Sequence, residues 1–144
     1  MHRLPACLIA SLTLLACGCA TPAQTRHFHV EPAVARLPAQ DDLAPAIHDE
    51  AVRGGRSAGW TDSASPAEAW VRMSFLWSED SGATPGKVRL VCRWSAADGR
   101  SGEATEGLAM YSHFWTASRA GDTAARICAG ILRDLSPGAP GPAR

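Results

Sequence analysis

The alternation of apolar and mostly polar side chains in two short segments most constrains the fold of this chain. Residues 69–77 and 87–95 each carry a large apolar side chain at every second position. These positions are Val71, Met73, Phe75 and Trp77 in the first segment, and Val88, Leu90, Cys92 and Trp94 in the second. A period of two is that of a strand with one buried face. The pattern therefore predicts two strands of a sheet whose apolar face is covered by other elements.

A turn and a third strand are expected to follow. Asp98-Gly99 is a common hairpin dipeptide, and we expect the third strand over about residues 102–115. A two-residue turn would place Leu108 opposite the charged Arg89. A three-residue loop over residues 98–100 would instead place Leu108 opposite Leu90. Since one residue of register moves every side chain to the other face, the second choice fits the apolar pattern better.

Two helices are predicted, one on each side of these strands in the sequence. The first runs over about residues 41–53, from Asp41-Asp42 to a stop at Gly54-Gly55. The second runs from a cap at Asp122 to residue 135. Their apolar faces have helical spacing: Leu43, Ile47 and Ala51 in the first, and Ala124, Ile127, Cys128, Ile131 and Leu135 in the second. With a short edge strand at residues 26–30, this predicts an α+β fold: an antiparallel sheet of three to four strands with two helices packed on one face.

The N-terminal segment has the pattern of an export signal. Arg3 is followed by an apolar run over residues 8–16, which is too short for a permanent membrane helix, and then by Cys17. A cysteine directly after Leu14-Leu15-Ala16 resembles the signal of bacterial lipoproteins. That resemblance implies that Cys17 is lipidated and becomes the new N-terminus. Cys19 is a second candidate for the lipid, and an ordinary secretory signal that is cut near Ala20 is the other interpretation.

The resemblance also implies a location and a division of the chain. Gly18 stands where an Asp would favour retention in the inner membrane, so the lipid anchor is expected in the outer membrane with the domain in the periplasm. We expect a signal peptide over residues 1–16, an anchor and tether over 17–25, and a single domain over 26–135. Residues 136–144 are rich in Pro and Gly and are expected to form a disordered tail.

Only two cysteines, Cys92 and Cys128, fall within the predicted domain. Cys92 occupies an apolar position of a strand, and Cys128 occupies an apolar position of the last helix. The periplasm is an oxidising compartment, so two domain cysteines are a candidate disulfide. Two free buried thiols are the competing interpretation, because cysteine is often buried.

The chain contains histidines and serines of the kinds that serve in catalytic and metal sites, but they do not form a recognisable catalytic or metal-binding motif. His27 and His29 would share one face of a strand, as metal ligands can. The serines of the loop over residues 56–66 lack the Gly-x-Ser-x-Gly pattern. We therefore expect no catalytic residue, no metal and no cofactor. The alternatives are a small metal-dependent or hydrolytic envelope enzyme using His27, His29 or His113, and a lipid or glycolipid carrier with an internal cavity.

Charge gathers on one face although the chain as a whole is balanced. Fourteen basic and fourteen acidic residues give no basic excess, so we expect no nucleic acid as a partner. The polar face of the predicted sheet nevertheless carries Arg72, Lys87, Arg89 and Arg93. Such a face beside a membrane can contact lipid phosphates or an acidic partner. The alternative is a solvated face on which Glu103 and Glu106 pair with these residues across strands.

The order of the predicted elements, after a lipid anchor, resembles small uncharacterised periplasmic lipoproteins and the auxiliary lipoproteins of envelope export machines. This resemblance transfers no functional residue to the chain. It implies a non-catalytic accessory or scaffolding module that faces the periplasm. The expected partners are outer-membrane lipid, through the anchor, and an envelope protein or polymer.

Overall fold

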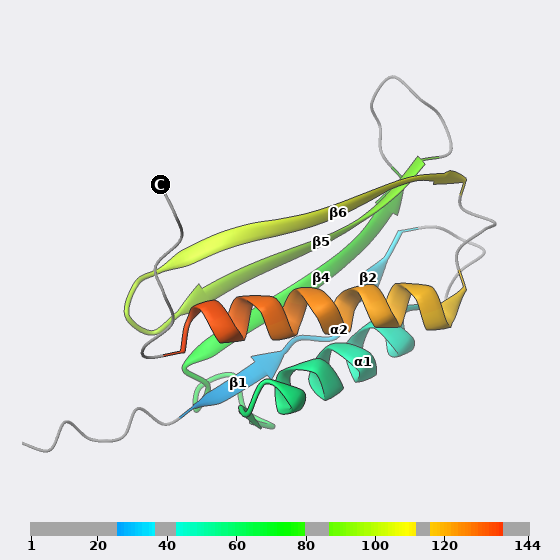
Figure 1. The fold of residues 1–144 in the computed structure, drawn as a ribbon. Coiled ribbons are helices and arrows are strands. Elements are labelled where there is room, and N and C mark those ends of the chain that lie inside the picture. The colour runs from blue at the N-terminus through cyan, green and yellow to red at the C-terminus, as the bar shows by residue number, and fades with distance from the viewer. Residues whose placement is uncertain (1–25, 37–42, 80–86, 112–115, 137–144) are drawn as a thin grey trace, which may run out of the picture.

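A computed structural model describes residues 26–36, 43–79, 87–111 and 116–136. These residues form one sheet and two helices (Figure 1). The elements are β1 (His27–Val30), β2 (Val34–Ala35), α1 (Leu43–Ser57), β3 (Thr61–Asp62), β4 (Val71–Glu79), β5 (Lys87–Ala96), β6 (Ser101–Tyr111) and α2 (Ala117–Asp134). The predicted α+β class is confirmed. The predicted signal and tether lie outside the described residues, as do residues 112–115 and residues 137–144 of the predicted tail.

The sheet is mixed and has six strands, so the prediction of a purely antiparallel sheet of three to four strands is wrong. The strand order is β3-β1-β4-β5-β6, and β2 pairs with β4. β1 lies between β3 and β4 and runs parallel to both, so it is not the edge strand that was expected. The parallel pairing arises because the chain leaves β1, passes through α1 and returns in β4, the crossover that parallel neighbours require.

Both helices cover the same face of the sheet, and the core lies between them and the strands (Figure 1). The four alternating apolar side chains of β4 are buried, and so are Leu43, Ile47 and Ala51 of α1, as predicted. The largest fully buried side chains are Trp77, Phe28 and Phe75. The hydrophobic effect acting on this one face therefore fixes which side of the sheet the helices occupy.

α1 continues through Gly54-Gly55, so the prediction that these glycines stop the helix is wrong. Both are buried within the helix. A Cβ built on Gly54 would lie 2.3 Å from the backbone oxygen of Ala125 in α2, and one on Gly55 would lie 2.3 Å from the ring of Phe28. The two glycines let α1 approach α2 and β1 more closely than any side chain would allow.

The end of α1 lies at a third glycine. Gly59 has φ +83°, the left-handed conformation in which glycine commonly ends helices. The backbone N–H of Gly59 donates to the oxygen of Arg56 at 3.0 Å, and that of Trp60 donates to Gly55 at 3.3 Å. This pair of bonds is the Schellman arrangement, and it leads the chain directly into β3.

α2 begins five residues before the predicted cap. Thr116 is the N-cap, and its side chain accepts a hydrogen bond from the backbone N–H of Arg119 at 3.3 Å. Asp122, which was predicted to cap the helix, lies exposed within it. The buried face is centred on Ala120, Ala124, Cys128 and Leu132, whereas Ile127 and Ile131 are only partly buried at its border.

The β5–β6 hairpin has the predicted loop length, but its loop lies one residue earlier. The N–H of Ala96 donates to the oxygen of Arg100 at 2.8 Å, so the loop is residues 97–99 and not 98–100. Gly99 is its third residue, with φ +89°. A three-residue hairpin loop requires a left-handed residue at that position. The predicted loop would have placed Arg100 there, at a steric cost that glycine avoids.

This change of loop alters every cross-strand pair of the hairpin. Leu108 lies opposite Val88, so the prediction that it faces Leu90 is wrong. Glu106 lies opposite Leu90, which faces the helices. From there its carboxylate accepts a hydrogen bond from Arg126 of α2 at 3.0 Å. Glu106 therefore belongs to the helix side and does not pair with the basic face.

Candidate functional site: the uncovered face of the sheet

The face of the sheet opposite the helices carries side chains that the strand register orders into rows. We call it the uncovered face, since both helices lie on the opposite face (Figure 1). One row runs Arg72, Ser95, Ser101 and the next runs Ser74, Arg93, Glu103, across β4, β5 and β6. The third row is Leu76, Val91, Thr105, and the fourth begins with Ser78 and Arg89. Polar and basic rows therefore lie on both sides of an apolar row.

The strand β1 lies beside β4 and extends each of the first two rows by one residue. Phe28 and Val30 are buried toward the helices, so His29 and Glu31 point to the uncovered face. His29 lies beside Arg72 in the parallel register. The backbone N–H of Glu31 donates to the oxygen of Met73 at 2.8 Å, which holds Glu31 next to the second row.

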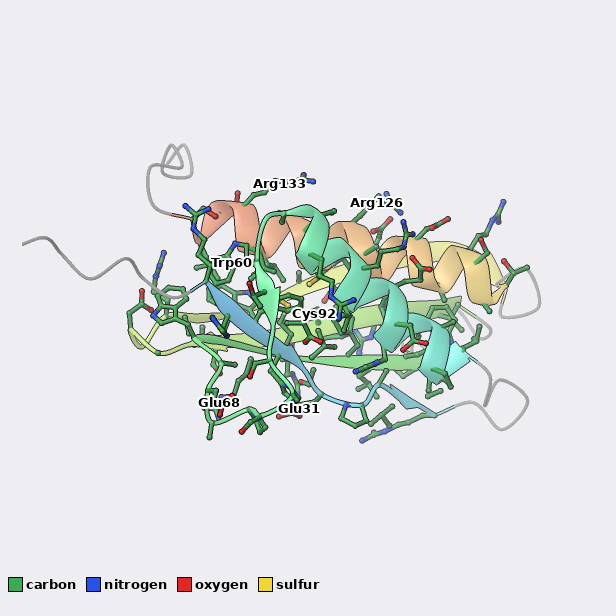
Figure 2. The ribbon with its side chains drawn as sticks, turned by 90° about the horizontal axis from the view of Figure 1, so that it is seen from below. Glu31, Trp60, Glu68, Cys92, Arg126 and Arg133 are labelled. Atoms are coloured by element: carbon green, nitrogen blue, oxygen red, sulfur yellow. The ribbon has the colours of Figure 1, made fainter. Side chains whose placement is uncertain are left out.

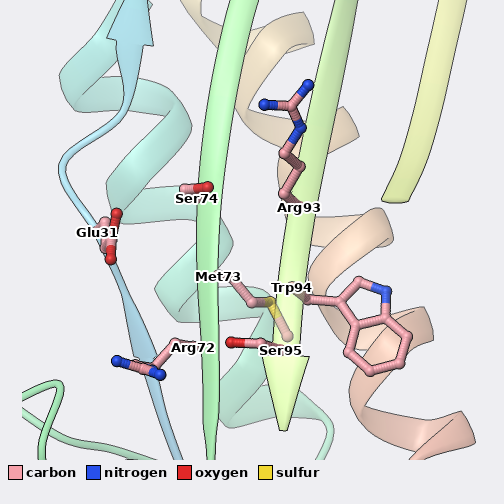
Figure 3. Close-up of a pocket in the computed structure, with 7 residues that line it drawn as sticks. All are labelled: Glu31, Arg72, Met73, Ser74, Arg93, Trp94 and Ser95. Atoms are coloured by element: carbon pink, nitrogen blue, oxygen red, sulfur yellow. The ribbon is translucent and has the colours of Figure 1, made fainter. Parts of the chain in front are cut away.

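A shallow pocket of about 180 Å³ opens where the first two rows meet. Figure 3 views it from the uncovered face, with the helices behind the strands. Its lining side chains include two arginines, two serines and one glutamate: Arg72, Ser74, Arg93, Ser95 and Glu31. Two positive groups and one negative group thus surround a space open to solvent.

A second, smaller pocket of about 120 Å³ lies along the apolar row. Leu76 and Val91 line it together with Val34 of β2, which is 51% exposed. Arg36 and Arg93 stand at its rim. Val34 supplies an exposed aliphatic side chain here, whereas Val91 is buried. An aliphatic side chain close to guanidinium groups suits a charged partner that also has apolar parts.

The predicted basic residues are only partly clustered. Arg72 and Arg93 line one pocket, whereas the apolar row separates Arg93 from Arg89, which is half-buried. Lys87 starts β5 at a shift of register, and its side chain lies outside the described part of the chain. The two basic residues that share a pocket, Arg72 and Arg93, therefore come from the neighbouring strands β4 and β5.

One predicted cross-strand pair is confirmed. Arg93 donates from Nε to Glu103 Oε2 at 2.9 Å, across β5 and β6. This hydrogen bond, together with the charge of Arg93, lowers the pKa of the exposed Glu103 carboxyl below its usual range. The bond uses the Nε edge of the guanidinium and leaves its terminal nitrogens available for another oxygen ligand.

The histidines and serines considered for catalysis are engaged in local structure. His29 shares a hydrogen bond of 2.7 Å between Nδ1 and the backbone oxygen of Ser63. The hydroxyl of Ser63 donates to the backbone oxygen of Ser65 at 3.0 Å, and that of Ser57 donates to Gly54 at 2.7 Å. His113 lies outside the described residues. In the described part of the chain, no three His, Cys, Asp or Glu side chains come together as metal ligands.

Cys92 and Cys128 are free thiols, both fully buried between β5 and α2. Burial, with a smaller contribution from Cys128, raises the pKa of Cys92 above its usual range. Burial also raises the pKa of Cys128 to about 12, against a backbone hydrogen bond from Gly55. In this reduced form both groups are protonated at neutral pH and react slowly while the protein is folded. The disulfide stays a prediction.

Several residues of the uncovered face were not singled out from the sequence, among them Glu31, Val34 and Arg36 and the pocket serines Ser74 and Ser95. A signal for Glu31 was present, because the alternation of residues 27–30 extends one position further. Its closeness to Arg72 could not be inferred, since it depends on the parallel pairing of β1 with β4. The two-residue strand β2 is too short to produce a readable period.

Comparison with known proteins finds neither a matching family model nor a matching curated sequence. Solved structures with a similar path of the chain include a variant of the PelC dodecamer from Paraburkholderia phytofirmans, at 16% identity over 75% of this chain and 86% of that chain, with a TM-score of 0.49. A DUF330 protein from Xanthomonas campestris is 13% identical over 79% and 85%, with a TM-score of 0.39. A minor lipoprotein from Acinetobacter baumannii is 14% identical over 77% and 95%, with a TM-score of 0.39. Likeness at this level concerns the arrangement of elements and carries no residue's role across. None of the described helices is long and apolar enough to cross a membrane.

Proposed function

We propose that this protein is a non-catalytic lipoprotein of the cell envelope, anchored by a lipid on Cys17 in the outer membrane. In this proposal the domain is an accessory binding module that faces the periplasm. Its uncovered face binds an anionic membrane surface. The anchor rests on the sequence pattern that precedes Cys17, and the binding face rests on the packing of the domain.

The observation that carries the proposal is the contrast between the two faces of one sheet. Both helices lie on one face (Figure 1). The other face carries more positive than negative charge in its described part: Arg36, Arg72, Arg89 and Arg93 against Glu31, Glu103 and, beside β1, Glu68. A positive surface held near a membrane attracts anionic headgroups, at about 1 kcal/mol for each basic residue close to the surface. The exposed Val34 adds an apolar contact.

Vesicle sedimentation tests this proposal. The unlipidated domain, residues 20–144, should sediment with phosphatidylglycerol vesicles at low salt and be released as salt screens the charges. Replacing Arg72 and Arg93 by Glu should abolish sedimentation. The matched control replaces Arg126 and Arg133, exposed arginines of α2 that lie across the molecule from Glu31 (Figure 2), and should keep it. Absence of wild-type binding at low salt would overturn the proposal.

A further inference from the structure

The pocket on the uncovered face has a regular arrangement of charges and hydroxyls. Arg72 lies directly opposite Ser95, and Ser74 lies directly opposite Arg93. All four point away from the helices, so the two arginines occupy diagonal corners of a rectangle and the two serines occupy the others (Figure 3). Diagonal neighbours on adjacent strands are about 7–8 Å apart, which is within reach of long side chains. The guanidinium groups point away from each other in Figure 3, and rotation about their side-chain bonds lets both reach one small anion between them. Two guanidiniums and two hydroxyls supply donors on several sides, as a tetrahedral phosphate requires.

A negative group borders the same pocket. Glu31 projects beside Ser74, on the side of β4 away from Arg93 (Figure 3). Within the described part of the chain, neither Glu31 nor Arg72 makes a side-chain hydrogen bond or ion pair. Glu31 is also exposed. The carboxylate can therefore bind a cationic group of a ligand whose anionic group lies at the arginines.

The pocket is shallow and open to solvent, with a volume of about 180 Å³. It can seat a small group such as a phosphate joined to a two-carbon amine. The rest of a larger ligand, such as the acyl chains of a lipid, would extend out of the pocket.

We propose that this pocket binds the phosphoethanolamine headgroup of a membrane lipid. The phosphate lies between Arg72 and Arg93 and accepts from Ser74 and Ser95, while the ammonium group pairs with Glu31. This inference rests on the proposed function, because it names the headgroup that one pocket of the binding face selects. The remaining positive charge of the face then contacts anionic neighbours of that lipid.

The test uses the isotope-labelled full chain in micelles of dodecyl maltoside, a detergent with neither charge nor phosphate. O-phosphoethanolamine and glycerol 1-phosphate are titrated while the backbone amide signals of Ser74 and Ser95 are followed by NMR. The two compounds share the phosphate, but only the first carries an amine. A solvated ion pair contributes about 0.2–1 kcal/mol, so the amine should tighten binding by up to about fivefold. Short-chain phosphatidylethanolamine added to the micelles should shift the same signals more than short-chain phosphatidylglycerol does.

Three variants assign the contributions. Glu31→Gln should remove the preference for the amine and keep phosphate binding. Arg72→Gln should weaken both compounds, and Arg133→Gln on α2 should change neither. Equal affinity of the wild-type chain for the two compounds would overturn the inference, as would a preference that survives in Glu31→Gln. A response to the soluble compounds without a response to phosphatidylethanolamine would exclude the lipid as its source.

These outcomes are separate from those of the proposed function. Sedimentation with phosphatidylglycerol vesicles depends on the net charge of the whole uncovered face and does not require Glu31. A chain that sediments with those vesicles but does not distinguish the two phosphates keeps the binding face and refutes the headgroup. A chain that does neither refutes both.

Discussion

Replacing Gly54 by alanine tests whether the close approach of α1 and α2 determines the stability of this fold. The new Cβ would lie 2.3 Å from the backbone oxygen of Ala125, 2.7 Å from its Cα and 2.8 Å from its carbonyl carbon. All three are backbone atoms of α2, so no side-chain rotation relieves the contact. Since such atoms normally stay more than 3 Å apart, the two helices must separate by about 1 Å, which loosens their shared core.

The expected loss of stability follows from two opposing effects. Overpacking of a well-packed interior costs about 1–3 kcal/mol, and three contacts with backbone place Gly54→Ala at the upper end. Alanine favours a helix interior over glycine by about 1 kcal/mol. The net destabilisation is therefore about 2 kcal/mol, which lowers the melting temperature of a domain of this size by roughly 10 °C.

Gly130 of α2 provides the matched control. A Cβ built on it meets nothing within 4 Å, so Gly130→Ala has the helical benefit without the clash and should stabilise by up to about 1 kcal/mol. Urea unfolding followed by circular dichroism measures both variants. If Gly54→Ala is as stable as Gly130→Ala, the helices do not approach each other as closely as described and the reasoning is refuted.

Three further predictions concern the lipid, the thiols and the cross-strand ion pair. Cys17→Ala should abolish incorporation of labelled palmitate and leave the protein soluble or as an uncleaved precursor; label that persists contradicts the assignment. Cys92 and Cys128 should form a disulfide that closes a loop of about 36 residues and stabilises the domain by roughly 3–4 kcal/mol. Mass spectrometry of the unreduced, denatured, alkylated protein should then find both cysteines unmodified, whereas adducts on both exclude the bond. Arg93→Gln should raise the pKa of Glu103 toward its ordinary value in an NMR titration. An unchanged titration of Glu103 in this variant would show that Arg93 does not cause the lowered pKa. In the wild-type protein, the stabilisation from this pair is present above the unfolded pKa of Glu103 and is lost as pH falls through its lowered folded pKa.

The strands and the apolar face of the first helix could be predicted because burial leaves a direct period in the sequence. Met73 and Phe75 differ from Arg72 and Ser74 in every property that decides which side of a strand faces water. Such alternation depends only on local geometry. The same reasoning placed Arg72 and Arg93 on the uncovered face correctly.

The errors arose where one residue type serves two purposes. Gly54-Gly55 has the composition of a helix stop, but its function in the fold is close packing against Ala125 and Phe28, and only the tertiary structure distinguishes these. The hairpin error was of a different kind. The position of Gly99 in the sequence indicates the correct loop, because a three-residue loop needs its left-handed residue in third place.

The pairing of distant segments could not be predicted from local pattern. The few residues of β1 gave no indication that this strand would insert beside β4, since that choice depends on how α1 carries the chain across the sheet. Glu31 joins the candidate site only through this pairing. The pocket is therefore a property of the topology, although each of its side chains is visible in the sequence.

The position of β1 inside the sheet also determines how the domain resists mechanical force. A force directed along β1 from its N-terminal end acts on a strand that is hydrogen-bonded on one side to β3 and on the other to β4. Backbone bonds from Thr61, Ser63 and Trp70 to this strand share the load at once, in shear, and do not open one after another. A domain held at its N-terminus by a lipid, and docked elsewhere on an envelope surface, would thus be held by a strand that is paired on both sides and not by one at the edge of the sheet.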